Sequence, residues 1–235
     1  MNSKSAISIF MIALAVFFSH GSPAAAADPI FFDDFESGDF EAWSAAKTDS
    51  GDLAVTATAA LEGSRGMRVR IDDNTSIYVQ DRSPTNERSY KAKFLFDPNS
   101  IRMADGDVHT IFLGQDLRSG TYVAALQVKL RKTASGYQLR ASARQDQGVT
   151  PTWINTRWFA ITDKSHEIEV EWDASQSAGV NNGQLSFSID SIERDNFFTL
   201  DNDTMRIDRV LLGAVSGIDT TTRGVYFFDL FESFD

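Results

Sequence analysis

Three alternating glutamates, Glu167, Glu169 and Glu171, are of the residue type that cleaves glycosidic bonds. Alternate residues of a strand face the same side, so this spacing predicts three carboxylates on one surface. A glycosidase needs two carboxyl groups that flank the scissile bond. Three like charges in a row also repel one another unless solvent screens them. We therefore prefer the interpretation that this is the solvated face of a strand, and we keep catalysis as the alternative.

A second group of residues combines aromatic and polar side chains in the way that a sugar-binding surface requires. A pyranose ring stacks on an aromatic ring while its hydroxyl groups need polar partners. The two tryptophans of this group are five positions apart, so a regular strand would turn them to opposite faces and leave one in the core. Trp43 and Trp172 are expected in the core, and packing is the competing interpretation for the whole group. The candidate ligand-binding residues are Trp153, Asn155, Arg157 and Trp158, with Tyr122 and Gln127 from a neighbouring strand.

A seven-residue pattern, Phe-Phe-Asp-x-Phe-Glu-Ser, occupies residues 31–37 and recurs at residues 227–233. The repeat predicts that the first and last strands lie side by side. That arrangement would bring Asp34, Glu36 and Asp229 together, and carboxylate oxygens are the ligands that calcium prefers. We therefore predict a structural Ca²⁺ site at these three residues. The alternative is that they are ordinary acids at turns and strand ends.

Two other acidic runs, at residues 72–75 and 201–204, are predicted to be turns. Each consists of Asp, Asn and Thr, and neither has the spacing of an EF-hand loop. The chain contains no cysteine, which excludes disulfides, thiolate zinc sites and a catalytic thiol. No phosphate-binding loop or dinucleotide fingerprint is present in the sequence. Nucleophilic triad chemistry also finds no support.

The formal net charge of the 235 residues is −11. An acidic chain has no electrostatic attraction for nucleic acid or for anionic lipid, so neither is an expected partner. The N-terminus carries Lys4, then an apolar stretch at residues 6–18, then small residues up to Ala27. This order predicts a cleavable signal peptide at residues 1–27 and a secreted protein, periplasmic or extracellular. The apolar stretch is too short to span a bilayer, which takes about 20 residues.

The remaining chain, residues 28–235, is predicted to form one all-β domain. Apolar residues alternate with polar ones at period two, and no segment keeps a helical period. Turn signals such as Asn181-Asn182-Gly183 separate the alternating segments. Short strands spaced in this way predict a two-sheet antiparallel sandwich. The clearest strands are expected at residues 90–96, 126–131, 137–144, 166–172 and 185–190.

Two segments carry a resemblance to known families. Residues 166–174 followed by residues 183–190 resemble the hairpin of laminin G-like domains. The opening residues 33–38 with Trp43, and the closing residues 226–229, resemble the first and last strands of concanavalin A-like lectin and glucanase jelly rolls. The resemblance implies a jelly-roll fold. It leaves function open, because one fold hosts lectins, glycanases, lyases and adhesion modules.

The resemblance also bears on the candidate sites. In similar carbohydrate-binding modules the opening Glu and an Asp of the last strand bind calcium, which implies Glu36 and Asp229 here. Residues 167–171 resemble the E-x-D-x-E strand of laminarinase-type glycoside hydrolases, but Glu169 stands where that motif has Asp. Residues 109–115 loosely resemble the Q-x-H strand of jelly-roll alginate lyases, whose R-x-E-x-R strand finds no match.

The sequence thus favours a secreted, non-catalytic module that binds an extracellular glycan or protein, with a structural calcium ion. The first alternative is a structural or adhesion domain of the laminin G-like kind. The second is a glycan-degrading enzyme, either a glycanase or a polysaccharide lyase.

Overall fold

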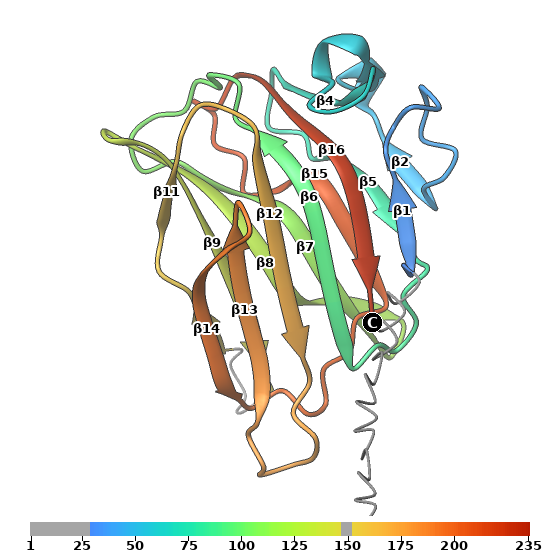
Figure 1. Ribbon diagram of the computed structural model, residues 1–235, viewed down its shortest axis with the longest axis vertical. Coiled ribbons are helices and arrows are strands. Elements are labelled where there is room, and N and C mark those ends of the chain that lie inside the picture. The colour runs from blue at the N-terminus through green and yellow to red at the C-terminus, as the bar shows by residue number, and fades with distance from the viewer. Residues whose placement is uncertain (1–28, 147–151) are drawn as a thin grey trace, which may run out of the picture.

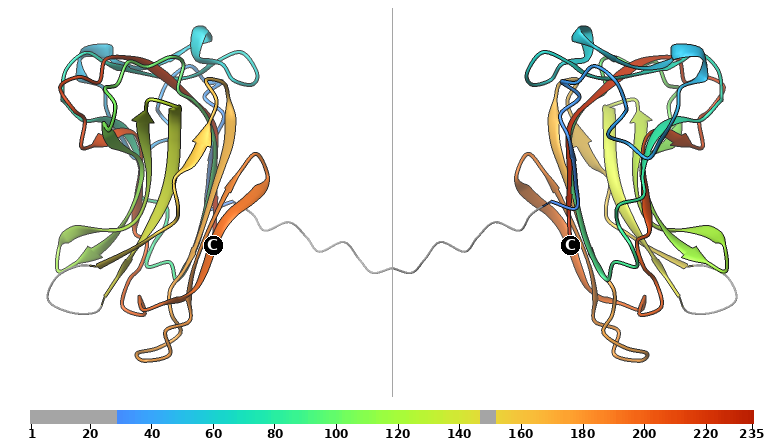
Figure 2. Two further views of the ribbon diagram at one scale, coloured as in Figure 1. Left: turned by 90° about the vertical axis from the view of Figure 1, so that its left-hand side faces the viewer. Right: turned by 90° about the vertical axis from the view of Figure 1, so that its right-hand side faces the viewer.

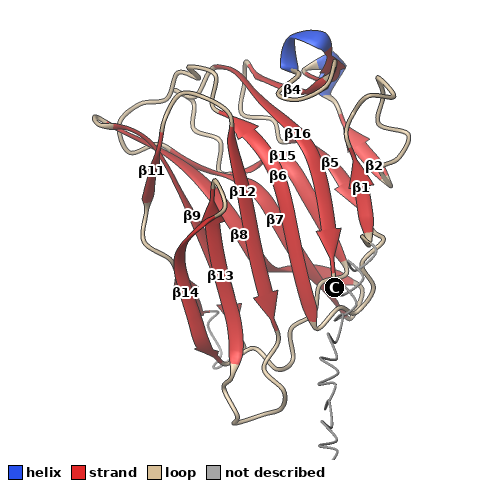
Figure 3. Ribbon diagram, viewed as in Figure 1, coloured by secondary structure: helices blue, strands red, loops and turns tan. Residues whose placement is uncertain are grey.

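The computed structural model describes residues 29–146 and 152–235, so the predicted signal peptide lies outside the described residues. In the described part, strands build two antiparallel sheets that pack face to face (Figure 1, Figure 3). Two short 3₁₀ helices, Asp49–Gly51 and Ala57–Ala59, are the helical segments found there. No helix among these residues is long and apolar enough to cross a membrane. The predicted all-β sandwich is confirmed.

Sheet A and sheet B contain eight strands each. The order in sheet A is β14 (Ile192–Leu200), β13 (Gly183–Ile189), β12 (His166–Asp173), β6 (Ser89–Asp97), β16 (Gly224–Phe234), β4 (Gly66–Ile71) and β3 (Leu53–Thr56), with β1 (Phe31–Asp33) paired to β16. The order in sheet B is β10 (Thr152–Asn155), β9 (Gly136–Gln145), β8 (Thr121–Thr133), β7 (Val108–Arg118), β15 (Arg209–Ser216), β5 (Ile77–Asp81) and β2 (Ala45–Lys47), with β11 (Phe159–Ile161) paired to β9.

The first and last strands lie side by side, as the duplicated terminal pattern predicts. Phe31 pairs with Ser233, and Asp33 pairs with Phe231. The Trp43 indole lies 5.2 Å from the Phe231 ring and donates a 2.6 Å hydrogen bond to the Asp33 carboxylate. An aromatic cluster and a buried polar contact therefore fasten the N-terminal strand to sheet A.

The inward positions of both sheets form one core. Phe94 of sheet A stacks on Phe112 of sheet B, with 5.8 Å between ring centroids. Trp172 is fully enclosed and Trp43 is 5% exposed, so both tryptophans that were expected in the core are there. Burying a phenylalanine side chain such as that of Phe94 contributes about 1.5–3 kcal/mol.

Sheet B bends outward toward the turn between β7 and β8, which makes its outer face concave (Figure 2). The pairing of β7 with β8 has two irregularities, and the pairing of β15 with β7 has one. An extra residue in one strand of a pair bends that strand and increases its twist. Gly213 of β15 has φ +140°, and a Cβ there would lie 2.5 Å from the Ile77 carbonyl oxygen. The strands therefore approach each other closely where the sheet curves.

Candidate functional site

The outer face of sheet B carries cationic and amide side chains. In β9, Leu139, Ala141 and Ala143 are completely buried, so the residues between them face outward. In β8, Lys129 pairs with Arg140 and Arg131 pairs with Gln138. No Asp or Glu stands at the outward positions of β8, β9 and β10 in the described part of the chain. Those positions hold Tyr122, Ala124, Gln127, Lys129, Arg131, Gln138, Arg140, Ser142, Arg144, Trp153 and Asn155.

Lys129 occupies the middle of this cationic group. It stands between Thr110 of β7 and Arg140 of β9 in the strand register. Burial, together with the positive charge of Arg140, lowers the pKa of Lys129 below its usual value. A lysine in this environment gives up its proton more readily than an exposed one, so Lys129 is suited to act as a base.

Trp158 holds two of the neighbouring arginines in place. The guanidinium carbons of Arg131 and Arg140 lie 4.2 and 4.5 Å from the centre of the Trp158 ring. Arg131 also donates a 3.0 Å hydrogen bond to the side chain of Gln138. Cation–π contacts restrict the guanidinium groups, so Trp158 positions these two arginines. Its ring is therefore less available for stacking on a sugar.

A second cationic centre lies farther along the face, at Arg209 of β15. Its Nε donates a 2.7 Å hydrogen bond to Gln115, and its Nη1 donates a 3.1 Å bond to Gln80. The guanidinium carbon lies 3.5 Å from the centre of the Tyr122 ring. Gln80 and Gln115 are 5% and 8% exposed, so Arg209 is fixed by two buried amides and one aromatic ring.

Trp153 and Trp158 lie on the same face, which corrects the expectation that one would be in the core. Trp153 pairs with Arg144, and Asn155 accepts a 2.8 Å hydrogen bond from Ser142. Regular alternation ends at Thr156, whose hydroxyl accepts the Ala141 N–H at 3.1 Å in place of a backbone carbonyl. The chain bends there, so that the next strand returns Trp158 to the outer face.

The other predicted ligand-binding residues divide between two places. Tyr122 and Gln127 both face outward, because the extra residue Ala125 in β8 changes the alternation between them. Arg157 instead lies at the edge of sheet B. Its side chain is 78% exposed and its Nε lies 3.7 Å from a carboxylate oxygen of Asp195 in β14. Five of the six predicted residues therefore share one face.

The three alternating glutamates lie on the outer face of sheet A, opposite the cationic face. Lys91 contacts Glu169 at 2.9 Å and Glu171 at 2.8 Å, and Lys93 contacts Glu167 at 3.4 Å. These residues form a ladder of cross-strand ion pairs between β12 and β6. Each of the three glutamates therefore has a lysine of the neighbouring strand as its ion-pair partner.

The predicted calcium ligands are placed as follows. Asp229 is fully buried and accepts hydrogen bonds from the backbone N–H groups of Leu61 and Glu62 at 2.9 and 3.0 Å. Glu36 accepts from Ser64 and Arg65 of the same loop, and Asp34 accepts from Glu36 N–H. Burial raises the pKa of Asp229 above its usual value. Glu36 and Asp229 therefore both accept hydrogen bonds from the backbone of the loop at residues 61–65.

The sequence contains a pattern that indicates the cationic face, and the predicted ligand-binding residues cover only part of that face. Residues 117–145 contain six Lys or Arg and no Asp or Glu, in a chain whose net charge is −11. On sheet A the outward lysines of β6 face the outward glutamates of β12, whereas the outward residues of β8 and β9 are cationic or neutral. The uniform sign of these outward positions distinguishes this face from the ion-paired outer face of sheet A.

No protein-family model matches the chain, and no curated protein matches its sequence. Solved structures do match its fold. An endo-β-1,4-glucuronan lyase from the fungus Trichoderma reesei has a TM-score of 0.68 at 9% identity, over 88% of this chain and 95% of the lyase. An alginate lyase in complex with alginate tetrasaccharide has a TM-score of 0.61 at 9% identity, over 86% and 95%. A Bacteroides ovatus mixed-linkage glucan GH16 protein has a TM-score of 0.58 at 12% identity, over 87% and 100%.

The chain therefore shares the two-sheet jelly-roll fold of these two lyases and of the GH16 protein. These matches also correct the sequence-based preference for a non-catalytic module. The structures that share this fold over nearly the whole chain include two polysaccharide lyases and a GH16 protein, so the fold gives no ground for that preference.

Proposed function

We propose that this protein is a polysaccharide lyase that cleaves an anionic, uronate-containing glycan on the outer face of sheet B. The observation that carries the proposal is the absence of carboxylates from the outward positions of β8, β9 and β10, which hold four basic residues: Lys129, Arg131, Arg140 and Arg144. Such a face attracts a polyanion even though the whole chain is acidic. Glucuronan and alginate, the substrates of the similar lyases, are polymers of this charge.

The absence of carboxylates from these outward positions also favours cleavage by elimination over cleavage by hydrolysis. Hydrolysis of a glycoside uses two carboxyl groups beside the bond. Elimination uses a base that removes the proton next to a uronate carboxylate. The electron pair then forms a carbon–carbon double bond, the bond to the glycosidic oxygen breaks, and that oxygen takes a proton from water. Cationic and amide groups suffice to stabilise the charge that develops on the carboxylate.

Lys129 is the base in this proposal, and the arginines beside it neutralise the carboxylate. The lowered pKa of Lys129 increases the fraction of neutral amine that can accept the proton. Arg140, directly opposite on β9, is close enough both to lower that pKa and to bind the uronate. Gln127 and Asn155 supply amides for the sugar hydroxyls.

Arg209 extends the site along the chain of sugars. Tyr122, which stacks on Arg209, stands seven positions before Lys129 in β8, a span of about 20 Å along a strand. Two cationic centres at that separation bind carboxylates several rings apart. A long polymer therefore binds better than a short oligosaccharide, and cleavage inside the polymer is favoured.

The test compares Lys129→Gln with Lys164→Gln, which removes an exposed lysine from a loop outside the face. Wild-type protein and the Lys164→Gln control should raise the ultraviolet absorbance of a glucuronan or alginate solution, because elimination creates a conjugated double bond. Lys129→Gln should slow this by about 10²–10⁴-fold. Equal rates in the two variants would refute the role of Lys129. Secretion, and the adhesion role implied by the laminin G-like hairpin, stay predictions.

A further inference from the structure

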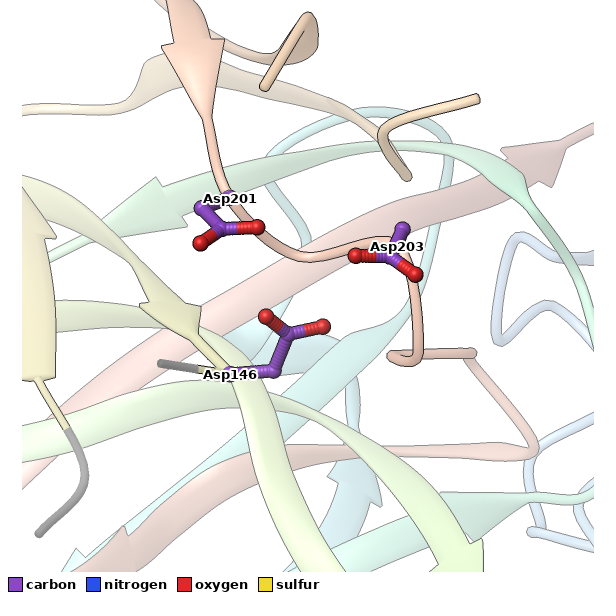
Figure 4. Close-up of side chains that lie close together, drawn as sticks. All are labelled: Asp146, Asp201 and Asp203. Atoms are coloured by element: carbon purple, nitrogen blue, oxygen red, sulfur yellow. The ribbon is translucent and has the colours of Figure 1, made fainter. Parts of the chain in front are cut away.

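Three aspartates from two sheets meet at one edge of the sandwich. Asp146 follows β9 of sheet B, and Asp201 and Asp203 follow β14 of sheet A (Figure 4). One carboxylate oxygen from each lies within 4.8 Å of the others. The Asp146 backbone N–H also donates a 2.9 Å hydrogen bond to the Asp201 carbonyl, so the two segments are fixed beside each other. The two aspartates of the turn predicted at residues 201–204 therefore lie beside Asp146, which comes from a distant part of the chain.

Asn202 explains why the two neighbouring aspartates face Asp146. Its side chain is fully buried, where it accepts the Ser175 N–H at 2.8 Å and donates to the Asp173 carbonyl at 3.0 Å. Gly183 leaves the space for it, because a Cβ at that position would lie 2.0 Å from the Asn202 oxygen. Since Asn202 is turned into the protein, Asp201 and Asp203 project the other way, toward Asp146 in Figure 4.

Asp201 is a largely buried residue whose carboxylate accepts no hydrogen bond from the residues that the structure describes. It is 7% exposed. Asp146, by contrast, accepts the N–H and hydroxyl of Thr204, both at 2.8 Å. The two carboxylates beside Asp201 repel its charge, and a cation among the three would remove that repulsion. The nearby cations are engaged elsewhere: Arg118 pairs with Asp116, and Arg206 donates to backbone carbonyls.

We propose that Asp146, Asp201 and Asp203 bind a calcium ion. Calcium takes six to eight oxygen ligands at about 2.3–2.6 Å, so two of its ligands lie at most about 5.2 Å apart. The 4.8 Å limit among the three carboxylates fits that range. Water and backbone carbonyls would complete the shell. The ion would join the end of β9 to the end of β14, and it is a different site from the one predicted at Asp34, Glu36 and Asp229.

Calorimetric titration of the purified protein with calcium chloride tests the site, with thermal unfolding in about 10 mM calcium or in chelator as a second readout. Wild type should bind calcium, and calcium should raise its Tm. Asp201→Asn, nearly identical in shape, should weaken binding at this site at least tenfold. Asp105→Asn, in an exposed turn, is the control and should bind as wild type does.

Asp229→Asn separates this site from the terminal one, because it should leave binding at Asp201 unchanged. Asp203→Asn serves as a second variant if Asp201→Asn does not fold, and should weaken binding in the same way. Calcium binding to Asp201→Asn or Asp203→Asn with wild-type affinity and stoichiometry would overturn the proposal. So would the absence of both heat and Tm change in wild type.

Discussion

At the residue scale, the chemistry depends on how Arg140 affects Lys129. Both side chains are partly buried and stand opposite each other on neighbouring strands. The positive charge of each side chain disfavours the charged form of the other, and burial disfavours the charged form of both. The pKa of Lys129 is accordingly lowered, first by burial and then by Arg140. Trp158 keeps Arg140 in this position through the cation–π contact.

Arg140→Gln should therefore move the pH profile of cleavage. The base must be neutral, so the rate rises with pH through the pKa of Lys129. Removing the positive charge of Arg140 raises that pKa and shifts the rising limb to higher pH. The measurement is kcat/KM against pH for wild type and variant. A purely structural loss would lower the rate at every pH and leave the midpoint where it was, which would contradict this account.

At the scale of single elements, regular strands are predictable from sequence and the functional face is not. Strict alternation marks β6 and β12, and both strands contain the residues expected of them. Ala125 and Thr156 each interrupt the alternation, and those two interruptions decide which way Tyr122 and Trp158 face. Neither interruption is marked by Gly or Pro in the sequence. A prediction based on strict alternation therefore assigns the side chains after each interruption to the wrong face.

β7 also places a histidine inside the sandwich, which makes folding sensitive to pH. His109 is 1% exposed, stacks on Tyr226 at 5.7 Å, and has no hydrogen-bond partner on either ring nitrogen among the described residues. Burial lowers the pKa of His109 to about 4. The unfolded chain, with a histidine pKa of about 6.5, binds the proton first as pH falls. Stability is therefore lost as pH drops from about 6.5 to about 4, by up to roughly 3 kcal/mol.

His109→Leu should remove this part of the pH dependence. The buried carboxylates Asp33 and Asp229 have raised pKa values, so their contribution has the opposite sign and is shared by wild type and variant. The useful quantity is the difference in unfolding free energy between the two proteins, measured by denaturant titration at several pH values. That difference should shift in favour of the variant by about 2–3 kcal/mol between pH 7 and pH 4. A difference that does not change with pH would contradict the assignment.

At the scale of the whole molecule, charge is divided between the two faces. Sheet A presents paired lysines and glutamates, while sheet B presents cations and amides on a concave surface (Figure 2). The net charge of −11 conceals this division, and it is the reason that composition alone argues against an anionic partner. The sandwich itself follows from alternation and turns. The proposed binding face follows from the strand register, which brings residues 127–131, 138–144 and 153–155 together.

The central claim is that this face cleaves an anionic glycan by elimination. Mass spectrometry of the products formed from glucuronan and from alginate tests it most directly, with a neutral β-glucan as the control. An elimination product is lighter by one water than the corresponding hydrolysis product, and it takes up no labelled oxygen from the solvent. We expect unsaturated oligouronates from wild type, almost none from Lys129→Gln, and no cleavage of the neutral glucan. Saturated products carrying solvent oxygen, or the absence of cleavage of either polyuronate, would contradict the account.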